Sequence, residues 1–304
     1  MNTLVAKPHK NDDEYFVTRL PRRDLTEHIV CYMGYERTLH RPVTRRLAAL
    51  GSVLMLIELD SPHRGRVAGT PQPPDRSPVV GLTDRPLLFT QYGRERGLLA
   101  ELTPLGARAL LGLPLRLISN TAVCAADLLG TEAGRLSERL IEARTWADRF
   151  QLLDEQLGAR IHSGAALPSQ VQGAWQELLR SAGRMRINTL AERVGWTRQH
   201  LNTRFREQIG LSPKAVARVA RFHAAIRLAT RPRPPSWAEV AASCGYSDQS
   251  HLHRDFRLLT GHGPTELLAS ANSRGSAFTG TRQGTRLVSQ DLCTYGSTPA
   301  GETG

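Results

Sequence analysis

Two different patterns of apolar and polar positions divide the chain. Up to about residue 125, short apolar, β-rich runs alternate with clusters of Gly, Pro and Asp, a pattern typical of strands joined by turns. The runs lie at Ile29 to Tyr35, Val53 to Leu59, Leu87 to Tyr92 and Leu98 to Leu102. We therefore expect a small antiparallel sheet or barrel in the N-terminal half.

Helical spacing follows these runs. Leu105 to Leu111 predicts a helical turn, and Ala122 to Leu129 predicts a helix. Glu132 to Ile161 carries a continuous apolar stripe at helical spacing, which predicts one long amphipathic helix. This stripe could pack on the sheet of its own domain or pair with a second chain, and we favour packing within the chain.

The C-terminal half contains one pattern twice. Six apolar, Gly or Pro positions recur at an offset of 50 or 51 residues. The pairs are Ala191 and Ala241, Gly195 and Gly245, Leu201 and Leu252, Phe205 and Phe256, Gly210 and Gly261, and Pro213 and Pro264. The offset changes after the second pair, so the second copy has one extra residue just after its Gly-aromatic turn. One structural unit has been used twice.

Each copy predicts a short helix, a tight turn at a glycine and a second helix. Asn188-Thr189 opens the first helix of the first copy, and Thr197 caps the next helix. In the second copy, Ser236 and Glu239 have the spacing of a capping box, and Ser247-Asp248 can cap the following helix. Two short helices joined at a glycine-containing turn predict a helix-turn-helix, whose second helix enters the DNA major groove.

The exposed positions of the two second helices carry side chains suited to that role, because Arg, Gln and Asn have bidentate geometry for base edges. The candidate DNA-binding residues are Arg198, Gln199, Asn202, Thr203 and Arg206 in the first copy, and Gln249, Ser250, His251, His253 and Arg254 in the second. The alternative is the solvated polar face of a helical bundle, and the duplication favours DNA binding.

A longer helix is predicted between the two copies. Ser212 caps it, Pro213 occupies a tolerated first-turn position, and the Pro-rich segment after Thr230 ends it. Such a connector would hold the two reading helices at a fixed separation, and successive major-groove segments lie about 34 Å apart. A single chain could then read an asymmetric site of about two turns.

The second copy, Gly245-Tyr-Ser-Asp-Gln-Ser-His-Leu-His-Arg-Asp-Phe-Arg followed by Gly-x-x-Pro, closely resembles the second helix-turn-helix of AraC-type transcription regulators. The first copy, ending in Gly-Leu-Ser-Pro213, resembles their first. The resemblance covers about residues 175 to 269 and implies two helix-turn-helix units joined by one long helix. Thr203 stands where the family commonly has Arg, and the chain after Pro264 lacks the usual aromatic-Arg ending.

The resemblance also implies which side chains lie in or near the grooves. They are those at the positions matching Gln199, Asn202, Thr203, Ser250, His251 and Arg254. The N-terminal half loosely resembles the β-rich N-terminal domain of some of these regulators, chiefly through Leu98 to Gly106 and Leu111 to Pro114. That likeness implies a sensing or regulatory role.

Charge agrees with a nucleic-acid partner. The formal net charge is +12, and residues 180 to 270 hold 15 Lys and Arg against 6 Asp and Glu. Such a surround favours phosphate binding, with an affinity that falls steeply with salt. The chain has no run of eighteen apolar residues and no apolar secretory core at its start, so we expect no membrane span and a cytoplasmic protein.

Catalytic chemistry has little support in the sequence. The four cysteines lie apart without a Cys-x-x-Cys pair, which argues against a zinc site or a disulfide framework. They are Cys31, Cys124, Cys244 and Cys293. We expect no metal, no cofactor and no catalytic residue. The alternative is an AraC-type domain fused to a DNA-repair or other enzymatic N-terminal domain, with Cys31 as the methyl acceptor.

The predicted architecture is a two-domain α+β chain. Residues 1–161 form a β-rich sensing or regulatory domain that ends in helices, 162–174 a linker, 175–269 an all-α double helix-turn-helix domain, and 270–304 a disordered tail. The predicted function is a sequence-specific transcription regulator, an activator, that reads two successive major-groove segments of promoter DNA. The other predicted partners are RNA polymerase, a small-molecule effector at the N-terminal domain, and a second copy of the chain. The alternative for the N-terminal half is a module that mainly dimerises and has no small-molecule ligand.

Overall fold

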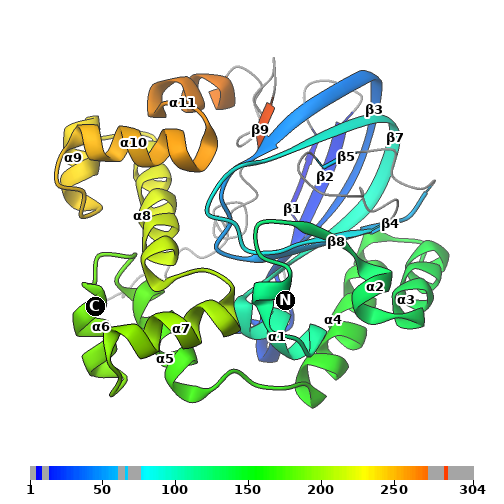
Figure 1. Ribbon diagram of the computed structural model, residues 1–304. Coiled ribbons are helices and arrows are strands. Elements are labelled where there is room, and N and C mark those ends of the chain that lie inside the picture. Colours follow the sequence, from blue (N-terminus) through cyan, green and yellow to red (C-terminus); the bar gives the residue numbers. More distant parts are fainter. Residues whose placement is uncertain (1–4, 9–13, 61–65, 68–76, 273–283, 287–304) are drawn as a thin grey trace, which may run out of the picture.

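The computed structural model describes residues 5–8, 14–60, 66–67, 77–272 and 284–286, and has a β-rich N-terminal part followed by a helical C-terminal part (Figure 1). The strands are β1 (Val5–Pro8), β2 (Glu14–Arg19), β3 (Ile29–Leu47), β4 (Val53–Glu58), β5 (Arg66–Val67), β6 (Pro78–Val80), β7 (Leu87–Leu102), β8 (Ala122–Cys124) and β9 (Gly284–Arg286). The α-helices of the N-terminal part are α1 (Pro104–Leu111), α2 (Ala125–Leu129), α3 (Thr131–Glu142) and α4 (Trp146–Ser163). Those of the C-terminal part are α5 (Ser169–Arg180), α6 (Ile187–Arg193), α7 (Arg198–Ile209), α8 (Pro213–Ala229), α9 (Trp237–Ser243), α10 (Gln249–Thr260) and α11 (Pro264–Asn272). Two short 3₁₀ helices, η1 (Arg23–Leu25) and η2 (Leu115–Leu117), complete the described elements. The predicted two-domain α+β class is confirmed.

The strands form one mixed but mainly antiparallel sheet in the order β1-β2-β3-β7-β4-β6-β8, with β5 on β7 and β9 parallel to β3. The long strands β3 and β7 pair along most of their length and form its centre. Two predicted runs, Leu87 to Tyr92 and Leu98 to Leu102, are therefore parts of one strand. The strands β1, β2, β5, β6 and β9 were not predicted.

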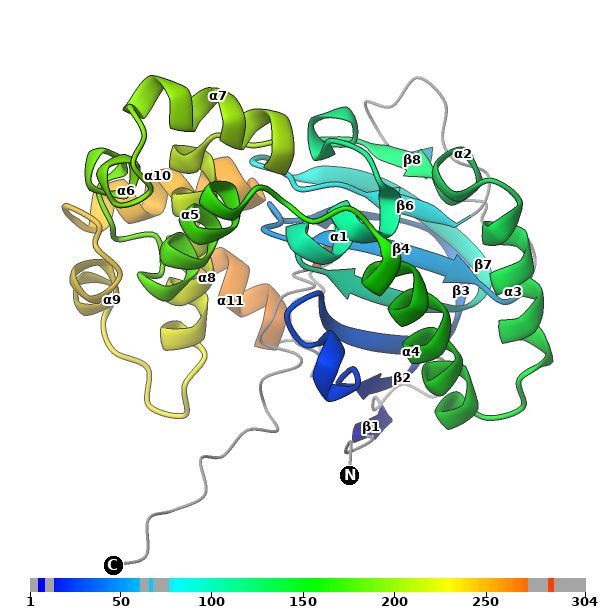
Figure 2. The same cartoon turned by 90° about the horizontal axis from the view of Figure 1, so that it is seen from below.

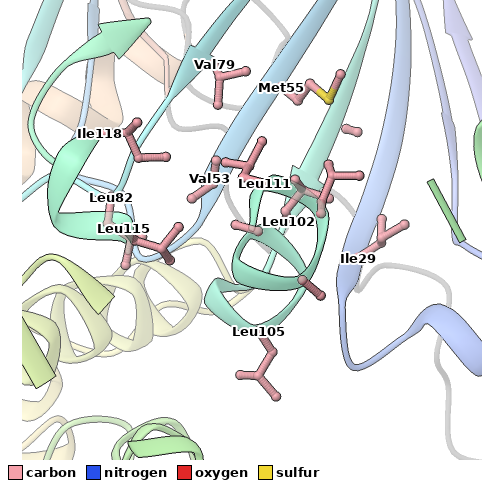
Figure 3. Close-up of a cluster of buried hydrophobic side chains, with 14 of the residues drawn as sticks. Ile29, Val53, Met55, Val79, Leu82, Leu102, Leu105, Leu111, Leu115 and Ile118 are labelled. Carbon is pink, nitrogen blue, oxygen red and sulfur yellow. The ribbon is translucent and has the colours of Figure 1, made fainter. Parts of the chain in front are cut away.

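One face of this sheet packs against α1 and η2, and α4 covers it further along (Figure 2). Side chains from β3, β4, β6 and β7 meet those of α1 and of the segment around η2 in a common core (Figure 3). The labelled side chains of that core are Ile29, Val53, Met55, Val79, Leu82, Leu102, Leu105, Leu111, Leu115 and Ile118. Leu115 and Ile118 thus belong to the core of the N-terminal domain.

Two of the predicted helices differ from the structure. The segment Ala122 to Leu129 begins as strand β8 and becomes helical only at Ala125. The long helix predicted from Glu132 to Ile161 is two helices, because Ala143 leaves the helical conformation and Thr145 starts α4 with a capping box.

The apolar stripe of α4 packs within its own domain, as predicted. Phe150 stacks on Tyr32 of β3 with ring centroids 6.0 Å apart. The Tyr32 hydroxyl donates a 3.0 Å hydrogen bond to Asp154 of α4, which also forms an ion pair with Arg19 of β2 at 3.0 Å.

The connection between the two parts is short. Residues 164–168 separate α4 from α5, so a helix crosses 169–174, the second half of the predicted linker. Residues 270–272 of the predicted tail belong to α11 and 284–286 to β9, while 273–283 and 287–304 lie outside the described residues. None of the helices in the described part of the chain has both the length and the apolarity to cross a membrane.

Candidate nucleic-acid interface

The first repeat folds as α6, a turn and α7. Gly195 occupies the turn with φ +73°, a left-handed conformation that favours glycine. Thr197 then caps α7, its hydroxyl accepting a hydrogen bond from the His200 amide at 3.1 Å. The predicted start of α6 at Asn188-Thr189 is late by one residue, since the helix begins at Ile187.

The second repeat has the same plan in α9 and α10. The predicted capping box is present: the Ser236 hydroxyl accepts from the Glu239 amide, and the Glu239 carboxylate accepts from the Ser236 amide at 2.8 Å. The Ser236 hydroxyl also donates to the Glu239 carboxylate at 2.8 Å, and this bond, followed by the one from the Ser236 amide, lowers the pKa of Glu239. Asp248 caps α10 by accepting from the His251 amide at 2.7 Å. Four positions lead from Gly245 to the start of α10, against three from Gly195 to α7, so the extra residue lies in the predicted turn.

The helix α8 connects the units, which lie at its opposite ends (Figure 1). Ser212 caps it by accepting from the Ala215 amide at 3.1 Å, Pro213 is its first residue, and Thr230 follows its end, all as predicted. Its buried side chains divide between the two units: Val216 packs in the core that contains α7, and Phe222 in the core that contains α10.

The structure places the predicted DNA-binding side chains on the outer faces of α7 and α10. Exposed residues are Arg198, Gln199, Thr203, Arg206, Gln249, Ser250 and Arg254, and half-buried ones are Asn202, His251 and His253. The apolar faces of the same helices are buried, with Leu201, Phe205, Leu252 and Phe256 fully so. Each helix therefore presents a polar face to an outside partner.

Some of these side chains have contacts within the protein. The Thr203 hydroxyl donates to the Gln199 carbonyl at 3.1 Å, and Gln249 Nε2 lies 3.4 Å from His253 Nε2. His251 has several contacts: its Nδ1 lies 3.2 Å from Ser247 Oγ, and its ring meets Tyr246 edge to face at 5.2 Å. The position of His251 is thus fixed by α10 and the preceding turn.

A buried acid on α10 was missed by the sequence analysis. Asp255 is 7% exposed, and its carboxylate lies 3.6 Å from Arg218 and 3.8 Å from Arg221, both on α8. His251 Nε2 is 3.9 Å from the same carboxylate. Asp255 falls between the buried positions Leu252 and Phe256, so an acidic residue on the apolar face was the available signal.

The N-terminal domain offers less site chemistry. Among the described cysteines, Cys124 and Cys244 form no disulfide, whereas Cys31 is disulfide-bonded. The expectation that the isolated cysteines form no disulfide is therefore wrong for Cys31. Within the described ranges, no group of three or more His, Cys, Asp or Glu side chains lies close enough together to hold a metal ion.

The comparison with known families agrees with this geometry. Residues 190–270 match the family model of a helix-turn-helix domain. No curated protein matches the chain. Among solved structures, ToxT from Vibrio cholerae is similar at 10% identity, over 78% of this chain and 97% of that one, with a TM-score of 0.47.

Two solved DNA-binding domains are similar to the helical half. The DNA-binding domain of AdpA, a global transcriptional factor in complex with a target DNA, is 25% identical over 35% of this chain and 96% of its own, with a TM-score of 0.32. The C-terminal domain of AraT, a response regulator from Geobacillus stearothermophilus, is 22% identical over 33% and 84%, with a TM-score of 0.30. At these TM-scores the similarities carry no conclusion about what this chain binds.

The fold and the family match define a class: the chain is a DNA-binding protein with a helix-turn-helix domain at residues 190–270. That helix-turn-helix domain is of the AraC type.

Proposed function

We propose that the chain recognises a specific promoter sequence by inserting α7 and α10 into two successive major-groove segments, and that it activates transcription there. The observation that carries the proposal is the duplicated unit itself. Each copy has a capped second helix with a buried apolar face and an outer face that carries Arg, Gln and His side chains, with Asn202 in addition on α7. Side chains of these types discriminate base edges.

The basic surround supports the same partner. Arg198, Arg206 and Arg254 are exposed on the two helices, and residues 180 to 270 carry far more Lys and Arg than Asp and Glu. Arginine binds phosphates and the guanine edge, and phosphate contacts position a protein on DNA without selecting a sequence. We assign Arg254 to base reading and Arg206 to a phosphate contact.

The test is fluorescence anisotropy with the full chain at physiological salt, in excess random DNA. The DNA upstream of its own gene is supplied as short overlapping duplexes. One duplex bound on the order of 10³-fold more tightly than the others establishes sequence-specific recognition. Equal, salt-sensitive binding to all duplexes would contradict it. A variant with both Asn202→Ala and Arg254→Ala is the control, and should lose the preference while keeping the non-specific binding.

Activation is the second part of the proposal and rests on the family resemblance. Among AraC-type regulators, activation through contact with RNA polymerase is the commoner mode of regulation. It predicts that adding the chain raises transcription from the identified promoter in a purified system. Repression in that assay would reverse the assignment.

A small-molecule effector is the third part. A cavity of about 330 Å³ lies between β4 and the helices α2 and α3, lined mainly by apolar side chains that include Met55, Ile57 and Leu136. This volume lies within the range of small-molecule pockets. A thermal shift with one compound of a metabolite panel, lost in Leu136→Trp, would support an effector there. A shift retained in that variant would place the effector elsewhere.

Self-association is the fourth part. Ile141 of α3 is about half exposed, an apolar side chain on the outer surface of the N-terminal domain. Sedimentation equilibrium of the full chain and of Ile141→Glu tests whether a homodimer forms through this helix.

The enzymatic alternative has no observation in its favour.

A further inference from the structure

The two helix-turn-helix units have separate cores. Leu201 and Phe205 of the first unit lie in the large core that extends into the N-terminal domain. Leu252 and Phe256 of the second unit lie in a different core. Within the C-terminal domain, α8 is the element that contributes to both. Arg184, which lies between α5 and α6, also donates from Nη1 to the Ser243 carbonyl of α9 at 3.4 Å, at an exposed position. The relative placement of the two units therefore depends on α8 and this contact, unless a third body contacts both units.

The N-terminal domain contacts the second unit at the end of α10. Ala48 and Ala49, in the turn after β3, are fully buried in the core of that unit. The Ala49 amide donates a 2.9 Å hydrogen bond to the Leu259 carbonyl, and Arg46 Nη1 donates to the Thr260 carbonyl at 3.4 Å. The last carbonyls of a helix lack partners within the helix. Here the N-terminal domain supplies partners for two of them.

The N-terminal domain also contacts the first unit at the end of α7. Leu115 and Ile118, which pack under the sheet, share a core with Phe205 and Ile209 of α7. Gly210 ends α7 with φ +93°, and a Cβ there would collide with Ser119 Oγ and lie 2.9 Å from the Leu115 carbonyl oxygen. The end of α7 is therefore in close contact with the segment after η2.

These two contacts are linked within the N-terminal domain. Leu50, next to Ala49, exchanges backbone hydrogen bonds with Thr83 at 3.1 and 3.0 Å. Asn120, next to Ser119, donates from its amide to the Leu82 carbonyl at 2.9 Å. The adjacent residues Leu82 and Thr83 thus hold both contacting segments in place.

We propose that the N-terminal domain determines which spacing between half-sites the protein accepts. It does so by bracing the ends of α7 and α10 through a unit that we call the brace: residues 48–50, 82–83 and 118–120. The inference rests on the proposed function. In this proposal the full chain selects the spacing between half-sites, although the side chains that read the bases all lie in the C-terminal domain.

The helical geometry of DNA makes binding sensitive to how the two helices are placed relative to each other. Inserting one base pair between half-sites moves them about 3.4 Å apart and rotates them by about a tenth of a turn. Two rigidly related helices accept few of these positions. Two helices joined only through α8 and the exposed Arg184 contact would follow the half-sites over several spacings.

The experiment uses the full chain with the duplex selected above and derivatives in which the two half-sites are moved apart or together by one to three base pairs. Two variants weaken the brace at different ends: Ala49→Glu places a charge in the core of the second unit, and Ser119→Trp forces the end of α7 away. Two controls carry the same new side chains at exposed positions of the N-terminal domain: Ala147→Glu on α4 and Leu117→Trp on η2. Circular dichroism and the affinity for a single half-site report whether each variant is folded.

The wild type and both controls should bind the duplex with the best spacing on the order of 10²-fold more tightly than the duplex with the worst spacing, since a misplaced half-site loses its base contacts. In the two brace variants this ratio should fall below about fivefold, with the single-half-site affinity unchanged. A folded brace variant that keeps the wild-type spacing profile overturns the inference. If one variant fails to fold, the other decides. If the wild type binds every duplex with the same affinity, the proposed function is overturned, and the brace with it. If the wild type prefers one duplex but the folded brace variants keep its spacing profile, only the brace is overturned.

Discussion

The carboxylate of Asp255 on α10 lies 3.8 Å from the guanidinium of Arg221 on α8, inside the second helix-turn-helix unit. Arg218 approaches the same carboxylate at 3.6 Å. Replacing Asp255 with Asn leaves two arginines beside a neutral group in a mostly buried site. We expect Asp255→Asn to lower the free energy of unfolding by about 1–3 kcal/mol, measured by urea denaturation. Asp127→Asn, at an exposed position of α2, is the matched control, and an equal effect of both changes would contradict the role of Asp255.

Stability should fall in mild acid because of His223 on α8. Burial, with a smaller contribution from Arg227, lowers the pKa of His223 to about 4, against an ordinary value of 6.5. Its Nε2 atom is buried without a hydrogen-bond partner, and its ring borders the small interdomain cavity that Glu101 also lines. The folded state thus resists protonation that the unfolded state accepts. The resulting stability is complete above pH 6.5 and is lost as pH falls towards 4, by on the order of 3 kcal/mol.

The measurement is urea unfolding of the wild type and His223→Gln at several pH values between 7 and 4. The difference between their unfolding free energies should change across that window, because only the wild type has this titration. Parallel profiles for the two proteins would show that His223 does not carry the effect.

Arg254→Ala should act on sequence preference. The side chain is exposed on the outer face of α10, where we assign it to a base edge. Its loss should cost about 1–3 kcal/mol with the selected duplex and relax the preference at one base pair. Anisotropy with duplexes substituted at each position identifies that base pair. An equal loss of affinity for random DNA would reassign Arg254 to the phosphates.

Arg206→Ala should act on all DNA alike. This residue lies in the last turn of α7, and we assign it to a phosphate. Removing one phosphate contact should weaken cognate and random duplexes similarly and reduce the slope of log affinity against log salt by about one. The salt titration is made on both duplexes, and a loss confined to the cognate one would be the contrary result.

Ser236→Ala should destabilise α9. The change removes an acceptor for the Glu239 amide and a partner of the Glu239 carboxylate, and loss of such a cap costs about 1 kcal/mol. Thr197→Ala in the first unit removes a cap without a reciprocal carboxylate and should cost less. Thermal unfolding of the two variants ranks them, and a larger loss in Thr197→Ala would contradict this account of the capping box.

The repeat could be predicted because its signals are local. Gly195 and Gly245 both have positive φ at their turns, and Thr197, Ser212, Ser236 and Asp248 all cap the helices that follow them. Each feature depends on a few neighbouring residues. The ten candidate DNA-binding residues follow from the same register, and their contacts with bases remain predictions.

The N-terminal domain was less predictable because its order is set by distant pairings. Gly93 has φ +83° between two apolar runs, which predicted a break, yet β7 continues through it because β3 pairs on both sides. In the long helix predicted at 132–161, the apolar stripe concealed a local signal, the Thr145 and Asp148 capping box that starts α4. Ala48 and Ala49 carry no signal at all, since an alanine at a domain contact is like any other alanine.

The two units at the ends of α8 are similar in backbone and different in side chains, and this gives the protein a polarity. Arg198 and Asn202 face outward on α7, while Gln249 and Arg254 do so on α10. A duplex read by both helices has a left and a right half that cannot be exchanged. With α7 and α10 on one duplex as proposed, reversing the operator in a promoter would turn the whole molecule end for end and carry the sheet domain to the opposite flank of the site.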